Sequence, residues 1–218
     1  MNRSHFYAML SRMKYINRWG LMNNTQYENI SEHSHQVAIL AHCLVLLHNK
    51  RFGGTLDPER AALLATFHDT TEIITGDMPT PVKYANPAIR DIYRQIEDDA
   101  AERLLALLPD DLRQEYTALL KPQSEDDRAL EVFVKAADRF SALIKCIEEM
   151  RMGNDEFRQA AAAIEQSIHE GKDLGCLYSS LLVDVNKPRL KAYYETIGFK
   201  EFGKMEFFGH EYYRMKYI

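Results

Sequence analysis

The sequence is short of cysteine and of long apolar runs, and each shortage excludes a class of protein. Its 3 cysteines are odd in number and form no C-x-x-C pair, which indicates a reducing compartment rather than a disulfide framework. No segment approaches the roughly 20 consecutive apolar residues that a membrane helix needs. The N-terminal segment also lacks the apolar stretch and cleavage site of a signal peptide. We therefore expect a cytoplasmic protein without membrane contact.

Positive charge is not in excess either. The chain has 27 Lys and Arg against 32 Asp and Glu, which gives a formal net charge of -5. This balance provides no electrostatic basis for binding a nucleic acid polymer or an anionic membrane. Hydrophobic residues make up 46% of the chain, as in ordinary globular proteins. The length of 218 residues suits one ample domain, or one domain with a small appendage.

Helical periodicity dominates the chain as far as about residue 170. The apolar spacing and the capping residues predict helices over residues 4–15, 29–51, 57–76, 86 to Pro109, 110–120, 126–152 and 154–168. The segment 57–76 is interpreted as one continuous helix, opened by Asp57 and Pro58 and closed at Gly76. The expected architecture is therefore a compact all-α bundle.

The segment 57–76 carries the first candidate site. On a continuous helix, His68 and Asp69 point about 100° apart and can reach one ion, and Glu72 faces the same side as His68. An imidazole and two carboxylates turned toward a packed interior are costly unless something charged meets them. A His-Asp pair alone has little weight, because a lone histidine on an apolar face is more often a core residue.

Two further polar side chains add weight to this site. His33 is in line with the apolar residues of the 29–51 helix, and Asp138 borders the apolar face of the 126–152 helix. With His68 and Asp69 they form a set of two imidazoles and two carboxylates. Such a set suits a divalent ion such as Mn²⁺, Co²⁺, Fe²⁺ or Zn²⁺, and its lack of thiols argues against a structural zinc.

Two loops have both a structural and a functional interpretation. Arg18 and Trp19 form either a solvated guanidinium beside a core aromatic or a phosphate clamp, since guanidinium binds phosphate oxygens in pairs. The loop 77–82, stiffened by two prolines, is either a plain turn or a rigid segment that holds Asp77 and Thr80 against a ligand.

The order His, His-Asp, Asp on an all-α chain resembles the HD-domain metal-dependent phosphohydrolases. The likeness is closer still to bacterial 5′-deoxynucleotidases of the YfbR type. It is carried by NRW at 17–19, ENISEHSHQVA at 28–38, ALLATFHDTTEIITGDMPTPVKY at 62–84 and VKAADRFSALIKCIEE at 134–149. It covers about residues 1–170, and GDMPTPVKY is specific to that group.

The resemblance implies an HD-domain helical bundle and a homodimeric phosphoric monoester hydrolase. Its substrates would be deoxyribonucleoside 5′-monophosphates, cleaved to deoxynucleoside and phosphate with a divalent cation such as Co²⁺ or Mn²⁺. The residues matched to the metal are His33, His68, Asp69 and Asp138.

The resemblance also implies roles around the phosphate and the sugar. We assign Glu72 as the base or orienter of the attacking water, Arg18 as the stabiliser of phosphoryl charge, and Asp77 as the acid for the departing oxygen. Trp19 would leave little room for a 2′-hydroxyl. The residues expected to contact the substrate are Arg18, Trp19, Asp69, Asp77 and Thr80.

Two alternatives to a 5′-deoxynucleotidase remain open. One is an HD hydrolase of another phosphate ester, such as a cyclic dinucleotide or a nucleoside triphosphate. The other is a non-catalytic nucleotide-binding module. The first is disfavoured because the motifs carry no cluster of extra basic residues, which a triphosphate would need. The second predicts loss of the metal set or of Glu72, and both are present.

The chain changes in character near its end, which divides it into a domain at 1–172 and an atypical segment at 173–218. This segment is rich in Tyr and Phe and predicts a helix followed by a β-hairpin around Gly209 and His210. It resembles the C-terminal part of GNAT-type acetyltransferases. It has no preceding pyrophosphate loop, so we expect no acetyl-CoA activity and interpret Tyr193 and Tyr194 as packing residues. The strands either pair with another chain or form a poorly ordered fusion end.

Overall fold

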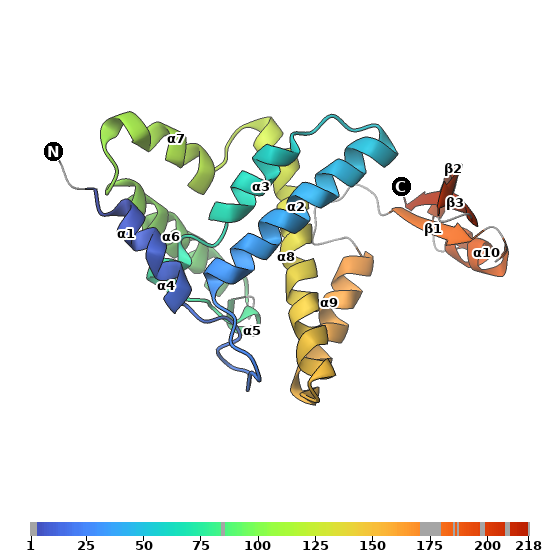
Figure 1. Ribbon diagram of the computed structural model, residues 1–218, viewed down its shortest axis with the longest axis horizontal. Coiled ribbons are helices and arrows are strands. Elements are labelled where there is room, and N and C mark those ends of the chain that lie inside the picture. Colours follow the sequence, from blue (N-terminus) through green and yellow to red (C-terminus); the bar gives the residue numbers. More distant parts are fainter. Residues whose placement is uncertain are drawn as a thin grey trace. The chain divides into compact units, whose positions relative to one another are not determined.

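The computed structural model describes residues 4–83, 86–170, 180–184, 186, 188–196, 199–207 and 210–217. These residues divide into two compact units, Met1–Ile164 and Glu165–Ile218. The first unit is helical, and the second combines strands with helix (Figure 1). The predicted all-α domain with a short α+β appendage is thereby confirmed, whereas the boundary predicted between residues 172 and 173 lies outside the described residues. None of the described helices is long and apolar enough to span a membrane.

The helices of the first unit differ widely in length. The two longest are α2, Ile30–Phe52, and α8, Glu125–Arg151. The others are α1 Phe6–Leu10, the 3₁₀ helix η1 Ser11–Tyr15, α3 Pro58–Phe67, α4 Glu72–Thr75, α5 Thr80–Lys83, α6 Pro87–Leu105, α7 Asp110–Leu120, the 3₁₀ helix η2 Asp155–Phe157 and α9 Arg158–Glu170, which continues into the second unit.

The core of this unit lies where α2, α3 and α8 meet, and Figure 1 shows α2 crossing α8. Its buried residues are Val37, Ala41, Val45, Ala61, Leu64, Ala65, Leu130, Val134 and Ala137. Alanine at many of these positions lets the helix backbones approach closely, while each buried Val or Leu contributes about 1.5–3 kcal/mol. The three helices therefore form a close-packed frame, and His33 on α2 and Asp138 on α8 are part of it.

Capping residues set the helix starts where the sequence predicts them. The Asn29 side chain accepts hydrogen bonds from the backbone N–H groups of Ser31 and Glu32, and the Glu32 carboxylate accepts one from the Asn29 N–H. Asp57 and Asn86 each cap a helix whose first residue is proline. These local signals therefore fix where α2, α3 and α6 begin.

The prediction of one helix over 57–76 is wrong, because the helix breaks at residues 68–71. In this turn the backbone bonds tighten to three-residue spacing, from Thr70 N to Phe67 O at 3.1 Å and from Glu72 N to Asp69 O at 3.0 Å. Asp and two consecutive threonines are weak helix formers, and burial of Thr70 holds the turn in place. The side chains of His68, Asp69 and Glu72 therefore do not follow the angular spacing of a regular helix.

The helix α6 turns part of its apolar side outward. Ile89, Ile92 and Ile96 are 38%, 58% and 46% exposed, whereas Tyr93, Ala100 and Leu104 on the same helix are buried. A row of isoleucines at this spacing on one helix is a surface that another molecule can cover.

Among the residues described in the second unit are a three-stranded antiparallel sheet and one helix of its own. Its elements are β1 Ser180–Asp184, α10 Pro188–Thr196, β2 Phe199–Phe207 and β3 His210–Tyr217, with strand order β1-β3-β2. The predicted helix and hairpin are confirmed, and β1 is a third strand that the sequence did not predict. Gly209 and the side chains of Tyr193 and Tyr194 lie outside the described parts of the chain.

Candidate metal centre and active site

Four of the predicted site residues converge from three places in the fold. His33 lies in the first turn of α2, His68 and Asp69 follow the end of α3, and Asp138 lies in the middle of α8. The His33 Nε2 atom is 3.0 Å from an Asp138 oxygen and 3.5 Å from an Asp69 oxygen. The same Asp69 oxygen is 3.1 Å from the Nε2 atom of His68.

The outer nitrogens of the two imidazoles are fixed by hydrogen bonds. The Nδ1 atom of His68 lies 2.6 Å from the Ala65 carbonyl oxygen, which can only accept, so Nδ1 carries the proton. The Nδ1 atom of His33 lies 3.0 Å from the hydroxyl of Ser141, whose own proton is donated to the Gln36 amide oxygen. In the neutral form of each ring, the unprotonated nitrogen is therefore Nε2, which faces the carboxylates.

These two Nε2 atoms are buried and have no hydrogen-bond partner. Ligand atoms of His33, His68 and Asp138 lie within 4.8 Å of one another, and the Asp69 carboxylate adjoins both rings. Buried bare nitrogens between carboxylates, each oriented through its second nitrogen, are the arrangement that a divalent cation satisfies. These residues therefore fit a metal ion on the evidence of their own contacts.

The charges around this cluster attract a cation. Burial opposes a charged imidazole, but the carboxylates of Asp69 and Asp138 outweigh it and raise the pKa of His68 to about 9. Burial also opposes ionised carboxylates, yet the neighbouring imidazoles hold the pKa of Asp69 and of Asp138 below the usual range. The two carboxylates thus favour positive charge at this place, either as a proton on His68 or as a bound cation.

Two other acids behave in the opposite way. Glu72, the first residue of α4, has a buried side-chain oxygen without a hydrogen-bond partner. Burial, together with the negative charges of Asp69 and Asp77, raises the pKa of Glu72 to about 9. Burial also raises the pKa of Asp77. Both carboxyl groups therefore hold protons more tightly than ordinary acids, which suits groups that exchange protons with a substrate.

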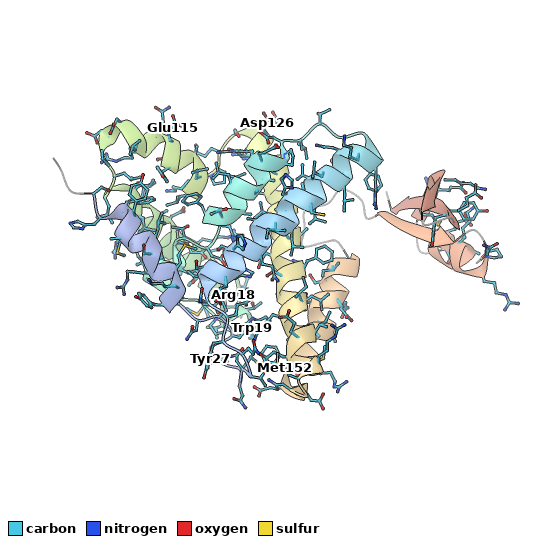
Figure 2. The ribbon with its side chains drawn as sticks, in the orientation of Figure 1. Arg18, Trp19, Tyr27, Glu115, Asp126 and Met152 are labelled. Carbon is cyan, nitrogen blue, oxygen red and sulfur yellow. The ribbon has the colours of Figure 1, made fainter. Side chains whose placement is uncertain are left out.

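Arg18 lies beside the cluster of His33, His68, Asp69 and Asp138, in the loop that precedes α2 (Figure 2). Its Nη1 atom donates a hydrogen bond to Glu28 at 2.8 Å, and its Nη2 atom is 3.8 Å from Asp138. Its side chain is only 13% exposed, so the interpretation of a solvated guanidinium is wrong. Arg18 thus brings fixed positive charge next to the residues that could hold a metal.

Trp19 connects the same loop to Asp77. Its backbone N–H donates to the Asp77 carboxylate at 3.1 Å, with the backbone of Trp19 at φ 61°. Its ring packs against Phe157, with the ring centroids 5.3 Å apart, and joins the apolar cluster around Cys146. Trp19 is therefore both a core contact and a neighbour of the site.

Thr80 is not brought into this cluster by any described contact. It is exposed at the start of α5, three residues beyond Asp77. Its place beside the sugar stays a prediction.

Three supporting residues were missed in the sequence. Glu28 holds the Arg18 guanidinium, while Ser141 and Gln36 orient His33. Ser141 lies on the predicted inward face of its helix, and a hydroxyl on such a face is a signal that a buried polar partner is near. Glu28 offers no comparable signal, because its partner is decided by the course of the loop.

The comparisons with known proteins cover the part of the chain that carries this site. The family described as 5′-deoxynucleotidase YfbR-like matches residues 5–177. The chain belongs to this family. Its relatives include a 5′-deoxynucleotidase of Photobacterium profundum, 50% identical over 77% of this chain and 86% of the relative. A 5′-deoxynucleotidase of Vibrio cholerae is 49% identical over 78% of this chain and 87% of the relative.

The family membership agrees with the fold of solved structures. An HD-domain phosphohydrolase from Listeria innocua superposes with a TM-score of 0.65, covering 78% of this chain and 81% of that one at 22% identity. The HD-type fold and the resemblance to YfbR-type enzymes are thereby confirmed. The family match ends at residue 177, so the acetyltransferase likeness of the following segment stays a prediction.

Proposed function

We propose that this protein is a metal-dependent 5′-deoxynucleotidase, a phosphoric monoester hydrolase that cleaves deoxyribonucleoside 5′-monophosphates to deoxynucleoside and phosphate. One observation carries this proposal. In a chain of the YfbR-like family, two imidazoles present buried, unpartnered Nε2 atoms to two carboxylates beside a largely buried arginine. This arrangement supplies a cation site and a phosphate site side by side.

The metal would be held by His33, His68, Asp69 and Asp138. A divalent cation bound there supplies Lewis acidity toward phosphoryl oxygen and makes water a stronger acid. Imidazole and carboxylate ligands suit Co²⁺, Mn²⁺ or a similar ion, which we propose as the cofactor.

Arg18 binds the phosphate and stabilises the charge that develops on its oxygens. Its guanidinium is positioned in advance because Glu28 holds one nitrogen while the other approaches Asp138. A phosphate oxygen can take the place of Asp138 beside the Arg18 Nη2 atom. The guanidinium is already oriented, so this binding costs little conformational entropy.

Glu72 and Asp77 divide the proton transfers. Glu72 accepts a proton from the attacking water, and its raised pKa makes it a stronger base than an ordinary carboxylate. The raised pKa of Asp77 suits this group to donate a proton to the departing 5′-oxygen.

Trp19, Asp77, Asp69 and Thr80 would contact the rest of the nucleotide. The Trp19 ring is fixed from behind by Phe157, so it leaves little room for a 2′-hydroxyl. A rigid apolar wall at this position favours deoxyribose over ribose.

The direct test is phosphate release from dAMP, AMP and dATP after treatment with EDTA and after addition of Co²⁺, Mn²⁺ or Zn²⁺. The proposal expects turnover of dAMP that EDTA abolishes and Co²⁺ or Mn²⁺ restores, with AMP and dATP poor substrates. Turnover of dATP in preference to dAMP would favour another phosphate ester. Binding of dAMP without turnover under any ion would favour a non-catalytic nucleotide-binding module.

We also propose a cytoplasmic homodimer. The exposed isoleucines of α6 support the dimer, because an apolar row of this kind is stabilised when a second copy covers it. Light scattering on the double substitution I92E/I96E tests it, with Ile39→Glu on α2, where Ile39 is 57% exposed, as the control. A dimer in the control and a monomer in the double variant are expected. A dimer in both would exclude the α6 surface.

A further inference from the structure

The loop over residues 17–29 is closed at its base by backbone bonds. The Arg18 N–H donates to the Glu28 carbonyl at 2.9 Å, and the Ile30 N–H donates to the Ile16 carbonyl at 3.0 Å. Asn17 and Asn29 form an isolated antiparallel bridge beside these bonds. Arg18 and Trp19 therefore stand at the start of a closed loop, and their positions depend on where the far part of the loop is held.

The far part of the loop is held by one buried carboxylate on α8. Glu149 is fully buried and accepts hydrogen bonds from the Thr25 N–H at 2.9 Å, the Thr25 hydroxyl at 2.6 Å and the Gln26 N–H at 3.1 Å. Lys145, one turn earlier on α8, is also buried and donates both to Glu149 and to the Gln26 carbonyl. The two side chains thus satisfy the backbone of the loop as a pair.

Side chains just beyond α8 complete this anchor. The Asn154 amide donates to Glu149 and to the Asn23 carbonyl, both at 2.8 Å, and Glu156 accepts from the Asn23 N–H at 3.2 Å. Figure 2 shows Trp19, Tyr27 and Met152 gathered at this end of α8. The segment that supplies these bonds also contains Phe157, against which the Trp19 ring packs.

A buried ion pair of this kind is an expensive way to stabilise a fold. Each ion loses favourable hydration when Lys and Glu are removed from water, and an apolar pair of similar volume is often as stable. What apolar side chains cannot do is accept from and donate to specific backbone groups of a loop. The pair is therefore suited to fixing one loop conformation.

We propose that Glu149, with Lys145, is a positioning residue that fixes the Arg18–Trp19 loop and thereby sets phosphate affinity and the preference for deoxyribose. It touches neither substrate nor metal and acts through the loop. This inference rests on the proposed function for its substrates, while the anchor itself has a readout that is independent of activity.

That readout is fluorescence, because Trp19 is the only tryptophan in the chain. The variant Glu149→Gln is expected to shift Trp19 emission to the red and to increase its quenching by acrylamide, with metal content unchanged. Loss of a buried charge that accepts several bonds should raise KM for dAMP roughly tenfold or more and lower the kcat/KM preference for dAMP over AMP by a similar factor.

The matched control is Asp127→Asn, at the opposite end of α8. Asp127 is 6% exposed and accepts two hydrogen bonds from Arg60 at 2.8 Å, so the variant also disrupts an ion pair whose carboxylate is buried. It should lower Tm while leaving Trp19 emission, KM and the dAMP preference as in the unmodified protein. Equal changes in both variants would show that Glu149 has only a structural role.

A milder variant covers failure of Glu149→Gln to fold. Thr25→Val deletes the hydroxyl bond to Glu149 and keeps the shape of the side chain, and we expect smaller changes in the same direction. Folded variants with unaltered Trp19 emission, KM and dAMP preference would overturn the proposal. If the unmodified protein does not hydrolyse dAMP, the proposed function fails, and the fluorescence comparison still decides whether Glu149 holds the loop.

Discussion

The carboxylates on the two sides of the site respond oppositely to similar surroundings. Next to the imidazoles, Asp69 and Asp138 have pKa values below the usual range. Next to the loop, Glu72 and Asp77 have raised pKa values. Burial disfavours the ionised form of all four. Around Asp69 and Asp138 the neighbouring imidazoles outweigh it, whereas around Glu72 and Asp77 the positive charge of Arg18 does not. One pair is thereby suited to hold a cation and the other to carry protons.

The largest effect is expected from a substitution of Asp138, one of the two carboxylates that adjoin the imidazoles. Asp138→Asn keeps the shape of the side chain but loses the charge that adjoins His33 at 3.0 Å. We expect loss of both bound metal and turnover, measured by elemental analysis and phosphate release. Full metal content together with full activity would show that Asp138 is not a ligand.

The next largest effect is expected from a substitution of Glu72, which leaves Asp69 and Asp138 in place. Glu72→Ala should retain the fold and the metal but lower kcat by about 10²–10⁴-fold, the usual contribution of a positioned acid or base. Elemental analysis and steady-state kinetics on the same preparation separate the two sides. Unchanged kcat would refute the assigned role of Glu72. Loss of bound metal would indicate that Glu72 is itself a metal ligand.

A smaller effect concerns the loop that carries Trp19. Trp19→Ala removes the wall beside the sugar, so AMP should compete better and the kcat/KM preference for dAMP should fall by about tenfold or more. Competition assays with both nucleotides measure the ratio. A preference that survives the substitution would place the discrimination elsewhere in the site.

The smallest effect is on stability. In the metal-free protein, the pKa of Glu72 is about 9, above its unfolded value, so this group destabilises the fold progressively as pH rises from about 4.5 to 9. Glu72→Gln removes that cost. In EDTA at pH 8.5, the Tm of the variant should exceed that of the unmodified protein by about 2–4 °C for each kcal/mol gained in the free energy of unfolding. The two proteins should agree near pH 5. A Tm difference that does not depend on pH would contradict the raised pKa.

The sequence was informative wherever a structural feature is decided locally. Asn29, Asp57 and Asn86 cap helices through neighbours only two or three residues away, and the starts of these helices were predicted. The inward placement of His33 followed from the apolar residues of its own helix. The break at residues 68–71 was not predicted, because helical periodicity continues through it and the burial of Thr70 that holds the turn is tertiary.

Long-range contacts explain the other failures. The anchoring of Thr25 by Glu149 joins residues 124 positions apart, and periodicity contains no information about it. The strand β1 was missed because a short apolar run such as Leu181–Val183 is equally compatible with strand, helix or loop until its pairing with β3 is known.

The two histidines of the proposed metal site acquire their orienting partners at different moments of synthesis. The His68 ring is oriented by a carbonyl three residues earlier, so its partner has already been synthesised when His68 is added. The His33 ring is oriented by Ser141, which leaves the ribosome 108 residues later. A nascent chain that stops before α8 is therefore expected to offer one oriented imidazole and no second. Metal loading should follow completion of α8 rather than accompany the emergence of the HD pair.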